Sequence, residues 1–217
     1  MIAIDPVAIA GLVAREVRTG SRDGATTRIA VARRTYPTDQ ADLWNALTDA
    51  ERIPRWFLPV SGDLSEGGRY QFEHNAGGLI ERCDAPESFA VTWEMGPNIS
   101  WVTVRLSATA DGTTLELEHE APVDPAFWEQ FGPGAVGVGW ELGLMGLGLH
   151  IDSGEPVDPV EGAAFATTPD GIDLIRRSAT GWADAAIADG DDAEAARAAA
   201  ARTLDFYTVE PDPSAGA

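Results

Sequence analysis

The chain contains no lysine: all fifteen of its basic residues are arginine, against thirty-five acidic residues in a length of 217. The absence of lysine excludes Schiff-base and lysine-nucleophile chemistry. The net charge of −20 repels phosphate backbones, so we expect no nucleic acid as a partner. There is only one cysteine, Cys83, which cannot form an internal disulfide and suits a reducing cytoplasm.

The sequence has no targeting signal at its start, because the first basic residue is Arg15 and no positively charged region precedes an apolar stretch. We therefore expect a cytoplasmic protein. Residues 131–151 are apolar except for Glu141 and His150 and are long enough to span a bilayer. Their many glycines, Pro133 and the lack of flanking basic anchors favour a buried helix over a membrane span.

The sequence also lacks a metal-binding pattern, and its one nucleotide-binding pattern lacks the required context. The three histidines, His74, His119 and His150, have neither HxxxH nor HExxH spacing, and Cys83 has no CxxC partner. Residues 132–137 match GxGxxG, but no hydrophobic strand precedes them and no βαβ unit follows. We expect no metal ion and no cofactor, and we interpret these glycines as positions where a helix packs closely against its neighbours.

Five successive strands are predicted from residue 67 to residue 121, because turn signals rich in Gly, Pro and Asp interrupt this segment repeatedly. Before them, residues 1–25 predict a short helix and a polar link, and residues 26–35 a strand that leads into a helix capped by Thr38. After a short turn, residues 132–150 predict a long helix that closes the open face of the sheet. The expected fold class is α+β.

The end of the sequence, residues 152–217, is strongly acidic, with fourteen acidic and four basic residues. After an irregular link at residues 152–168, its periodicity predicts two amphipathic helices, the second capped by Asp191 or Asp192, and a frayed end at residues 211–217. The apolar residues of the preceding long helix go most of the way round it, so either this extension or a second subunit is expected to cover its back.

Alternation along the strands predicts which side chains face inward. Glu116, Glu118 and Glu120 must form a solvated face, which directs their neighbours into the sheet's concave side. By this reasoning His74 and His119 both point inward. The residues assigned to this side are Tyr70, Phe72 and His74; Phe89, Val91, Trp93 and Met95; and Leu115, Leu117 and His119.

Short segments of the chain resemble the family related to the C-terminal domain of the activator of heat-shock protein 90 ATPase. The order of elements is similar to the helix-grip fold of the START-like, or SRPBCC, superfamily. The resemblance covers residues 26–151, between the N-terminal helix and link of residues 1–25 and the acidic extension of residues 152–217, which resembles extensions on actinobacterial members and is expected to pack on the domain. The segments that carry it are Thr35-Tyr36, Asp42-Leu43-Trp44, Asn45-Ala46-Leu47-Thr48, residues 52–57, Gly67-Gly68-Arg69-Tyr70, Glu81, Pro86, Val91-Thr92-Trp93-Glu94 and Gly139-Trp140.

This resemblance implies a deep, mostly apolar cavity between the sheet and the long helix, and it implies no particular reaction. The leading hypothesis is binding of a small hydrophobic or aromatic molecule by a monomer or homodimer. Glu141, which interrupts the apolar helix, is either exposed or a polar group in this cavity. The candidate ligand-binding residues are Trp56, Tyr70, Phe72, His74, Trp93, His119, Trp140, Glu141 and Leu144.

Two alternative functions remain, one enzymatic and one a protein-interaction role. In the first, the protein is a cyclase or dehydratase in which His119 or His74 is the general base. In the second, suggested by the family and by the acidic surface, it is a co-chaperone-like protein-interaction domain. The sequence does not contain Gly-x-Ser-x-Gly or another locally supported nucleophile motif that would favour an enzyme.

Overall fold

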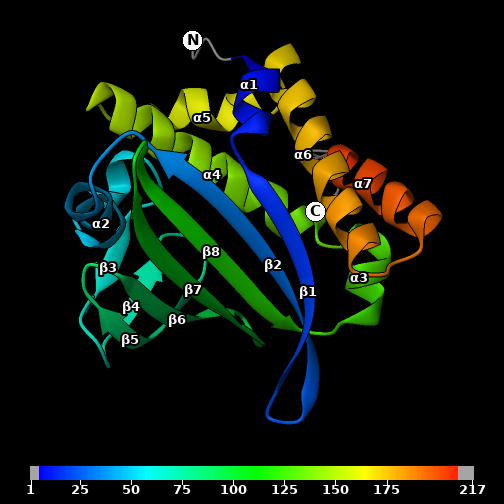
Figure 1. Ribbon diagram of the computed structural model, residues 1–217, viewed down its shortest axis with the longest axis horizontal. Coiled ribbons are helices and arrows are strands. Elements are labelled where there is room, and N and C mark those ends of the chain that lie inside the picture. The colour runs from blue at the N-terminus through cyan, green and yellow to red at the C-terminus, as the bar shows by residue number, and fades with distance from the viewer. Residues whose placement is uncertain (1–4, 210–217) are drawn as a thin grey trace, which may run out of the picture.

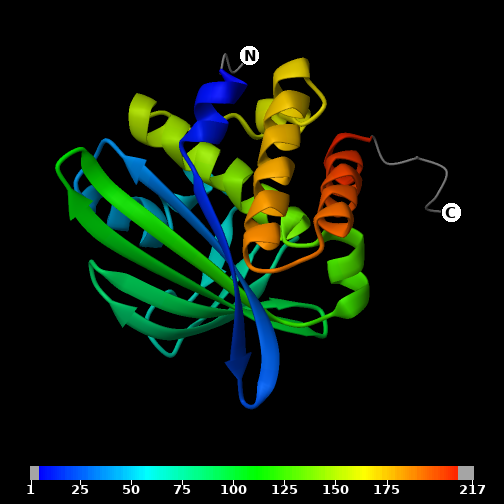
Figure 2. The same cartoon turned by 45° about the vertical axis from the view of Figure 1, so that its right-hand side comes forward.

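An eight-stranded antiparallel sheet curves around one long helix (Figure 1 and Figure 2). The computed structural model describes residues 5–209 of the chain. Within them, the strand order is β1-β2-β8-β7-β6-β5-β4-β3, and every neighbouring pair is antiparallel. The predicted α+β fold class, an antiparallel sheet wrapped around a long helix, is confirmed.

The elements have the following bounds. The strands are β1 (Ala14–Arg22), β2 (Ala25–Tyr36), β3 (Val60–Gly62), β4 (Arg69–Phe72), β5 (Gly77–Asp84), β6 (Ser88–Met95), β7 (Asn98–Thr109) and β8 (Gly112–Pro122). The helices are α1 (Pro6–Gly11), α2 (Gln40–Thr48), the short 3₁₀ turn η1 (Ile53–Arg55), α3 (Pro125–Phe131), α4 (Gly134–Ser153), α5 (Pro159–Phe165), α6 (Pro169–Ala188) and α7 (Ala193–Thr208).

The predicted five-strand meander is confirmed as β4 to β8, which pair in chain order. Two strands were not predicted: the three-residue β3, and β1, which occupies most of the expected polar link and pairs with β2. Strand β1 was missed because its outward side chains, among them Glu16, Arg18 and Arg22, carry charge that is typical of a linker. In the fold these charges are paired with residues of β2 and β8, and Arg18 also pairs with Glu16 on β1 itself.

Helix ends differ from the predictions in places. Asp39, one residue after Thr38, caps α2 with its side chain, and the expected turn at residues 125–130 is the helix α3, capped by Asp124. The expected irregular link contains the helix α5. The two amphipathic helices of the extension are confirmed as α6 and α7, with Asp192 as the cap of α7. The end expected to fray, residues 211–217, lies outside the described residues.

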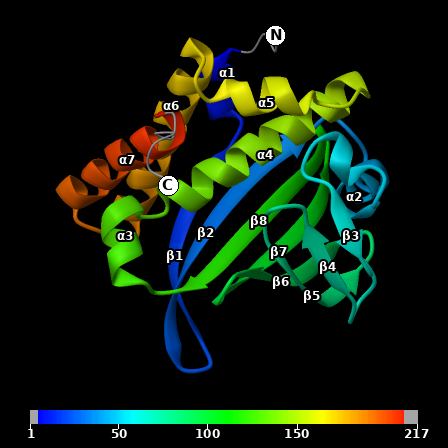
Figure 3. The same cartoon turned by 180° about the vertical axis from the view of Figure 1, so that it is seen from behind.

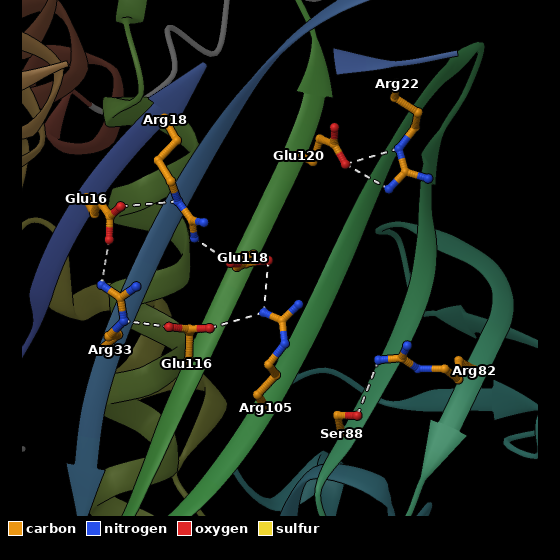
Figure 4. Close-up of polar contacts among 10 residues, drawn as sticks. All are labelled: Glu16, Arg18, Arg22, Arg33, Arg82, Ser88, Arg105, Glu116, Glu118 and Glu120. Carbon is orange, nitrogen blue, oxygen red and sulfur yellow. Dashed lines mark hydrogen bonds and ion pairs between the residues drawn. The ribbon is translucent and has the colours of Figure 1, made fainter. Parts of the chain in front are cut away.

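The outer face of the sheet carries a ladder of ion pairs across four strands, β1, β2, β8 and β7 (Figure 4). Arg33 on β2 lies 2.6 Å from Glu116, and Arg105 on β7 lies 2.9 Å from Glu118, which also pairs with Arg18 on β1. Burial alone would raise the pKa of Glu118, but hydrogen bonds from Arg105 and Arg18 outweigh it and hold that pKa below its ordinary value. The predicted outward face of β8 is confirmed, and its glutamates are paired with arginines.

Helix α4 is buried on two sides. It lies across the inner face of the sheet, and α6 covers its back, while α3 and α7 gather near its first turns (Figure 3). By length and composition α4 could cross a membrane, but 56% of its most apolar window is buried inside the protein. This burial supports the prediction of a core helix whose apolar side chains go most of the way round.

Glycines let neighbouring side chains approach α4 closely. We expect alanine substitutions at two of them to have opposite effects on stability. A Cβ at Gly137 would lie 2.2 Å from the Trp182 ring, which is 1% exposed and has no room to move, whereas a Cβ at Gly143 would lie 3.5 Å from Phe57 in ordinary contact. We expect Gly137→Ala to lower the free energy of unfolding by about 2 kcal/mol through overpacking. Gly143→Ala should raise it by up to about 1 kcal/mol through helix propensity. Urea denaturation of both variants measures this, and equal effects would contradict the described packing.

Candidate functional site

A cavity of about 310 Å³ lies between the inner face of the sheet and α4. Strands β6, β7 and β8 supply its floor, because their inward side chains alternate with the charged outer face. Helix α2, the turn η1 with the loop that follows it, strands β4 and β5, and α4 complete the walls. The residues of the floor are Phe89, Val91, Val102, Val104, Leu115 and Leu117.

Six of the nine predicted site residues line this cavity, on four different parts of the chain. Among them, aromatic rings form a continuous wall from β4 through β6 to α4. The ring centroids of Tyr70 and Phe72 are 5.4 Å apart, those of Phe72 and Trp93 are 5.8 Å apart, and those of Trp93 and Trp140 are 4.9 Å apart. The six residues are Trp56, Tyr70, Phe72, Trp93, Trp140 and Leu144.

Hydrogen bonds to the backbone fix the orientation of two of these rings. The Trp56 indole N–H donates to the Ala46 carbonyl at 2.8 Å, and the Tyr70 hydroxyl donates to the Thr92 carbonyl at 2.8 Å. Burial, followed by the charge of Glu94, raises the pKa of Tyr70, so its hydroxyl keeps its proton. These polar groups are therefore occupied, and the rings present their carbon atoms to the cavity.

His119 is buried and faces inward, as predicted, but it lies behind the aromatic wall and is not among the residues that line the large cavity. Its Nδ1 accepts a hydrogen bond from the Trp140 indole at 2.9 Å, so the neutral ring carries its proton on Nε2, which lies 2.8 Å from Ser100 Oγ. Ser100 in turn donates to the Trp93 carbonyl. Burial lowers the pKa of His119 to about 4. His119 thus holds Trp140 in place through two engaged nitrogens.

The predicted position of His74 is wrong. Strand β4 ends at Phe72, and His74 lies in the following turn with a φ of 53° and a side chain that is 93% exposed. The alternation that places Tyr70 and Phe72 inward does not continue through a turn, since the backbone changes direction there.

Glu141 is buried, but its predicted place in the cavity is wrong. Its carboxylate faces β1 and α6, where it accepts two hydrogen bonds from Arg15, both at 2.6 Å, and one from the Trp182 indole at 2.7 Å. Successive residues of a helix differ by about 100° in direction, so Trp140 and Leu144 face the cavity while Glu141 faces away. The rule that a buried carboxylate requires partners holds, and the partners come from the N-terminal strand and the extension.

Sequence reasoning missed several lining residues, among them Trp44, Phe57 and Gly143. A signal existed for Trp44, because it shares one face of α2 with Leu47 and Thr48, which also line the cavity. Gly143 gave no signal, since its contribution is the space that a side chain would fill. Within residues 5–209, no group of three or more His, Cys, Asp or Glu side chains could hold a metal ion.

A family model described as "Activator of Hsp90 ATPase homolog 1-like protein" matches residues 37–148. The chain belongs to this family. The matched region begins just after β2, ends within α4, and contains all six predicted residues that line the cavity. The resemblance predicted from the sequence is confirmed.

Solved structures agree with this membership. The crystal structure of CalU16 from Micromonospora echinospora is 30% identical over 80% of this chain and 97% of that chain, with a TM-score of 0.65. Its solution NMR structure gives 32% identity, 82% and 97% coverage and a TM-score of 0.69. DynU16, a protein in the dynemicin biosynthetic locus, is 21% identical over 59% of this chain and 48% of that chain, with a TM-score of 0.52, and shows the fold alone. No curated protein matches the chain.

Proposed function

We propose that this family member is a cytoplasmic protein that binds a small hydrophobic molecule in the cavity between the sheet and α4. One observation carries the proposal: a cavity of about 310 Å³ survives inside a well-packed fold, with walls that are apolar or aromatic except for Thr48 and Cys83. Known ligand pockets occupy roughly 300–1,000 Å³ and have the same predominantly apolar character. Removing apolar ligand surface from water in such a pocket contributes a favourable transfer free energy of about 25 cal/mol per Å².

A histidine base is not favoured by the geometry of the described residues. Both ring nitrogens of His119 are engaged, and Trp140 separates it from the large cavity. His74 is exposed in a turn outside that cavity. General-base catalysis requires a nitrogen within hydrogen-bond reach of the substrate, and neither histidine offers one. The arrangement therefore favours ligand binding over a cyclase or dehydratase that uses His119 or His74 as its base.

Filling the cavity from α4 tests the proposal. We expect two- to four-ring aromatic compounds and long-chain alcohols to include ligands that raise the melting temperature of the wild-type protein, because a ligand that binds only the folded state stabilises it by mass action. Gly143→Leu places a side chain in the cavity and should weaken binding at least about tenfold, which is 1.4 kcal/mol of lost binding free energy. Differential scanning fluorimetry followed by calorimetric titration measures both effects.

The matched control is Gly143→Ala, whose added methyl group meets Phe57 at ordinary contact distance and leaves most of the cavity open. It should retain binding. A panel in which no compound shifts the melting temperature, or equal affinity in the Gly143→Leu and wild-type proteins, would contradict binding at this place.

A further inference from the structure

The walls of the cavity are uncharged. Among the described residues, no charged side chain lines it, and the chain as a whole carries a net charge of −20. Arg34 reaches α4 from β2, but its guanidinium donates to the Leu144 carbonyl at 2.8 Å and does not line the cavity. A carboxylate that entered would lose its hydration without gaining a cation, which is strongly unfavourable.

Acidic residues lie near the end of the cavity at β5 and affect which charges it accepts. Cys83 lines the cavity there, and its pKa is raised by burial first and then by the charges of Glu66 and Asp84. Glu66 also accepts a hydrogen bond from the Cys83 backbone N–H at 2.9 Å, so its carboxylate lies close to Cys83 and would repel a bound anion there, whereas Asp84 is paired with Arg82. Both the missing cation and the Glu66 carboxylate act against an anionic ligand.

Two hydrogen-bond donors in the walls have no acceptor. Trp44 and Trp93 both line the cavity, and neither indole N–H makes a hydrogen bond within the described part of the chain. The indoles of Trp56 and Trp140 and the hydroxyl of Tyr70, in contrast, donate to protein acceptors. Neither indole nitrogen is among the fully buried unpartnered atoms of the described residues, so both N–H groups are accessible, and an oxygen atom on a bound molecule could accept from one of them.

From these observations we infer that the cavity selects an uncharged aromatic ring system that carries an oxygen acceptor for Trp44 or Trp93, and that it rejects the corresponding carboxylate. This inference rests on the proposed function and specifies the class of ligand. The two indole N–H groups select for the oxygen acceptor, and the remaining apolar walls hold the ring system.

Three compounds of nearly the same shape test the inference: 2-acetylnaphthalene, which has a carbonyl acceptor; 2-ethylnaphthalene, which has none; and 2-naphthoate, which is anionic at pH 7.5. Titrations into the full-length protein, followed by tryptophan fluorescence, should give the tightest binding for the ketone. We expect the ethyl compound to bind about fivefold more weakly, as for loss of one ordinary hydrogen bond. The carboxylate should bind at least about 100-fold more weakly.

Variants separate the donors from the shape of the cavity. Trp44→Phe and Trp93→Phe each keep a ring in place and remove an N–H, and the double variant should bind the ketone and the ethyl compound equally. A preference for the ketone that survives in the double variant, or naphthoate binding as tightly as the ketone, would overturn the inference while leaving the proposed function intact. If none of the three compounds binds, the inference and the proposed binding of ring systems both fail.

Discussion

Replacing Glu141 by leucine is expected to lower the free energy of unfolding by about 3–5 kcal/mol. The substitution leaves the Arg15 guanidinium, whose side chain is 13% exposed, without its carboxylate, and it leaves the buried Trp182 indole N–H without an acceptor. Removing one partner of a buried ion pair costs more than the pair contributes, because the remaining charge stays desolvated. Urea denaturation of the purified variant measures the change.

A double-mutant cycle shows whether the pair itself is responsible. The double variant Arg15→Met/Glu141→Leu replaces both charges by apolar groups and should lose less stability than the sum of the two single variants. Ligand affinity serves as the control, since Glu141 faces away from the cavity and its replacement in a folded protein should leave binding unchanged. Additive single effects, or a specific loss of ligand binding, would contradict the position assigned to Glu141.

Acidification is expected to destabilise the protein through His119. The folded-state pKa of this histidine is about 4, below the ordinary value of 6.5, because the ring is buried. Between these two values the unfolded chain binds a proton that the folded protein does not, so stability falls as the pH decreases from about 6.5 toward 4. A shift of this size corresponds to at most about 3 kcal/mol. Unfolding free energies measured at intervals from pH 7 to pH 4.5 should show this slope.

The variant His119→Gln isolates this contribution, since an amide can accept from Trp140 and donate to Ser100 but does not titrate. We expect its stability to depend less on pH than that of the wild-type protein in this window. His74→Gln is the matched control, because the His74 side chain is 93% exposed, and it should follow the wild-type curve. A His119→Gln curve parallel to the wild-type curve would show that His119 is not held neutral by the fold.

Much of the fold could be predicted because the signals were local and redundant. Three glutamates at alternate positions of β8 fixed the outward face of a central strand, and a repeated set of turn residues separated β4 to β8. Strand β1 was not predicted, because two of its charged side chains, Arg18 and Arg22, have partners on β8, about 100 residues away in the chain. The composition of a short segment does not show whether its charges pair with residues distant in the sequence.

The candidate site was predictable in its aromatic part and not in its polar part. Trp93 and Phe72 lie on strands whose side chains alternate between the two faces of the sheet, so this two-residue period predicted that both side chains point inward. For Glu141 the helical period gave its angle relative to Trp140, but it did not show which side of α4 would face the cavity and which would face α6. The sequence likewise did not indicate that His119 would be enclosed behind Trp140, because that contact joins two elements that are distant in the chain.

The most direct test of ligand binding in the cavity is an NMR measurement of nuclear Overhauser contacts between bound 2-acetylnaphthalene and the methyl groups of the protein. The account predicts contacts to methyl groups of Val104, Leu117 and Leu144, which line the cavity from three elements. Contacts confined to exposed apolar side chains such as Val123 and Val209, or none at a saturating concentration of the ketone, would contradict it.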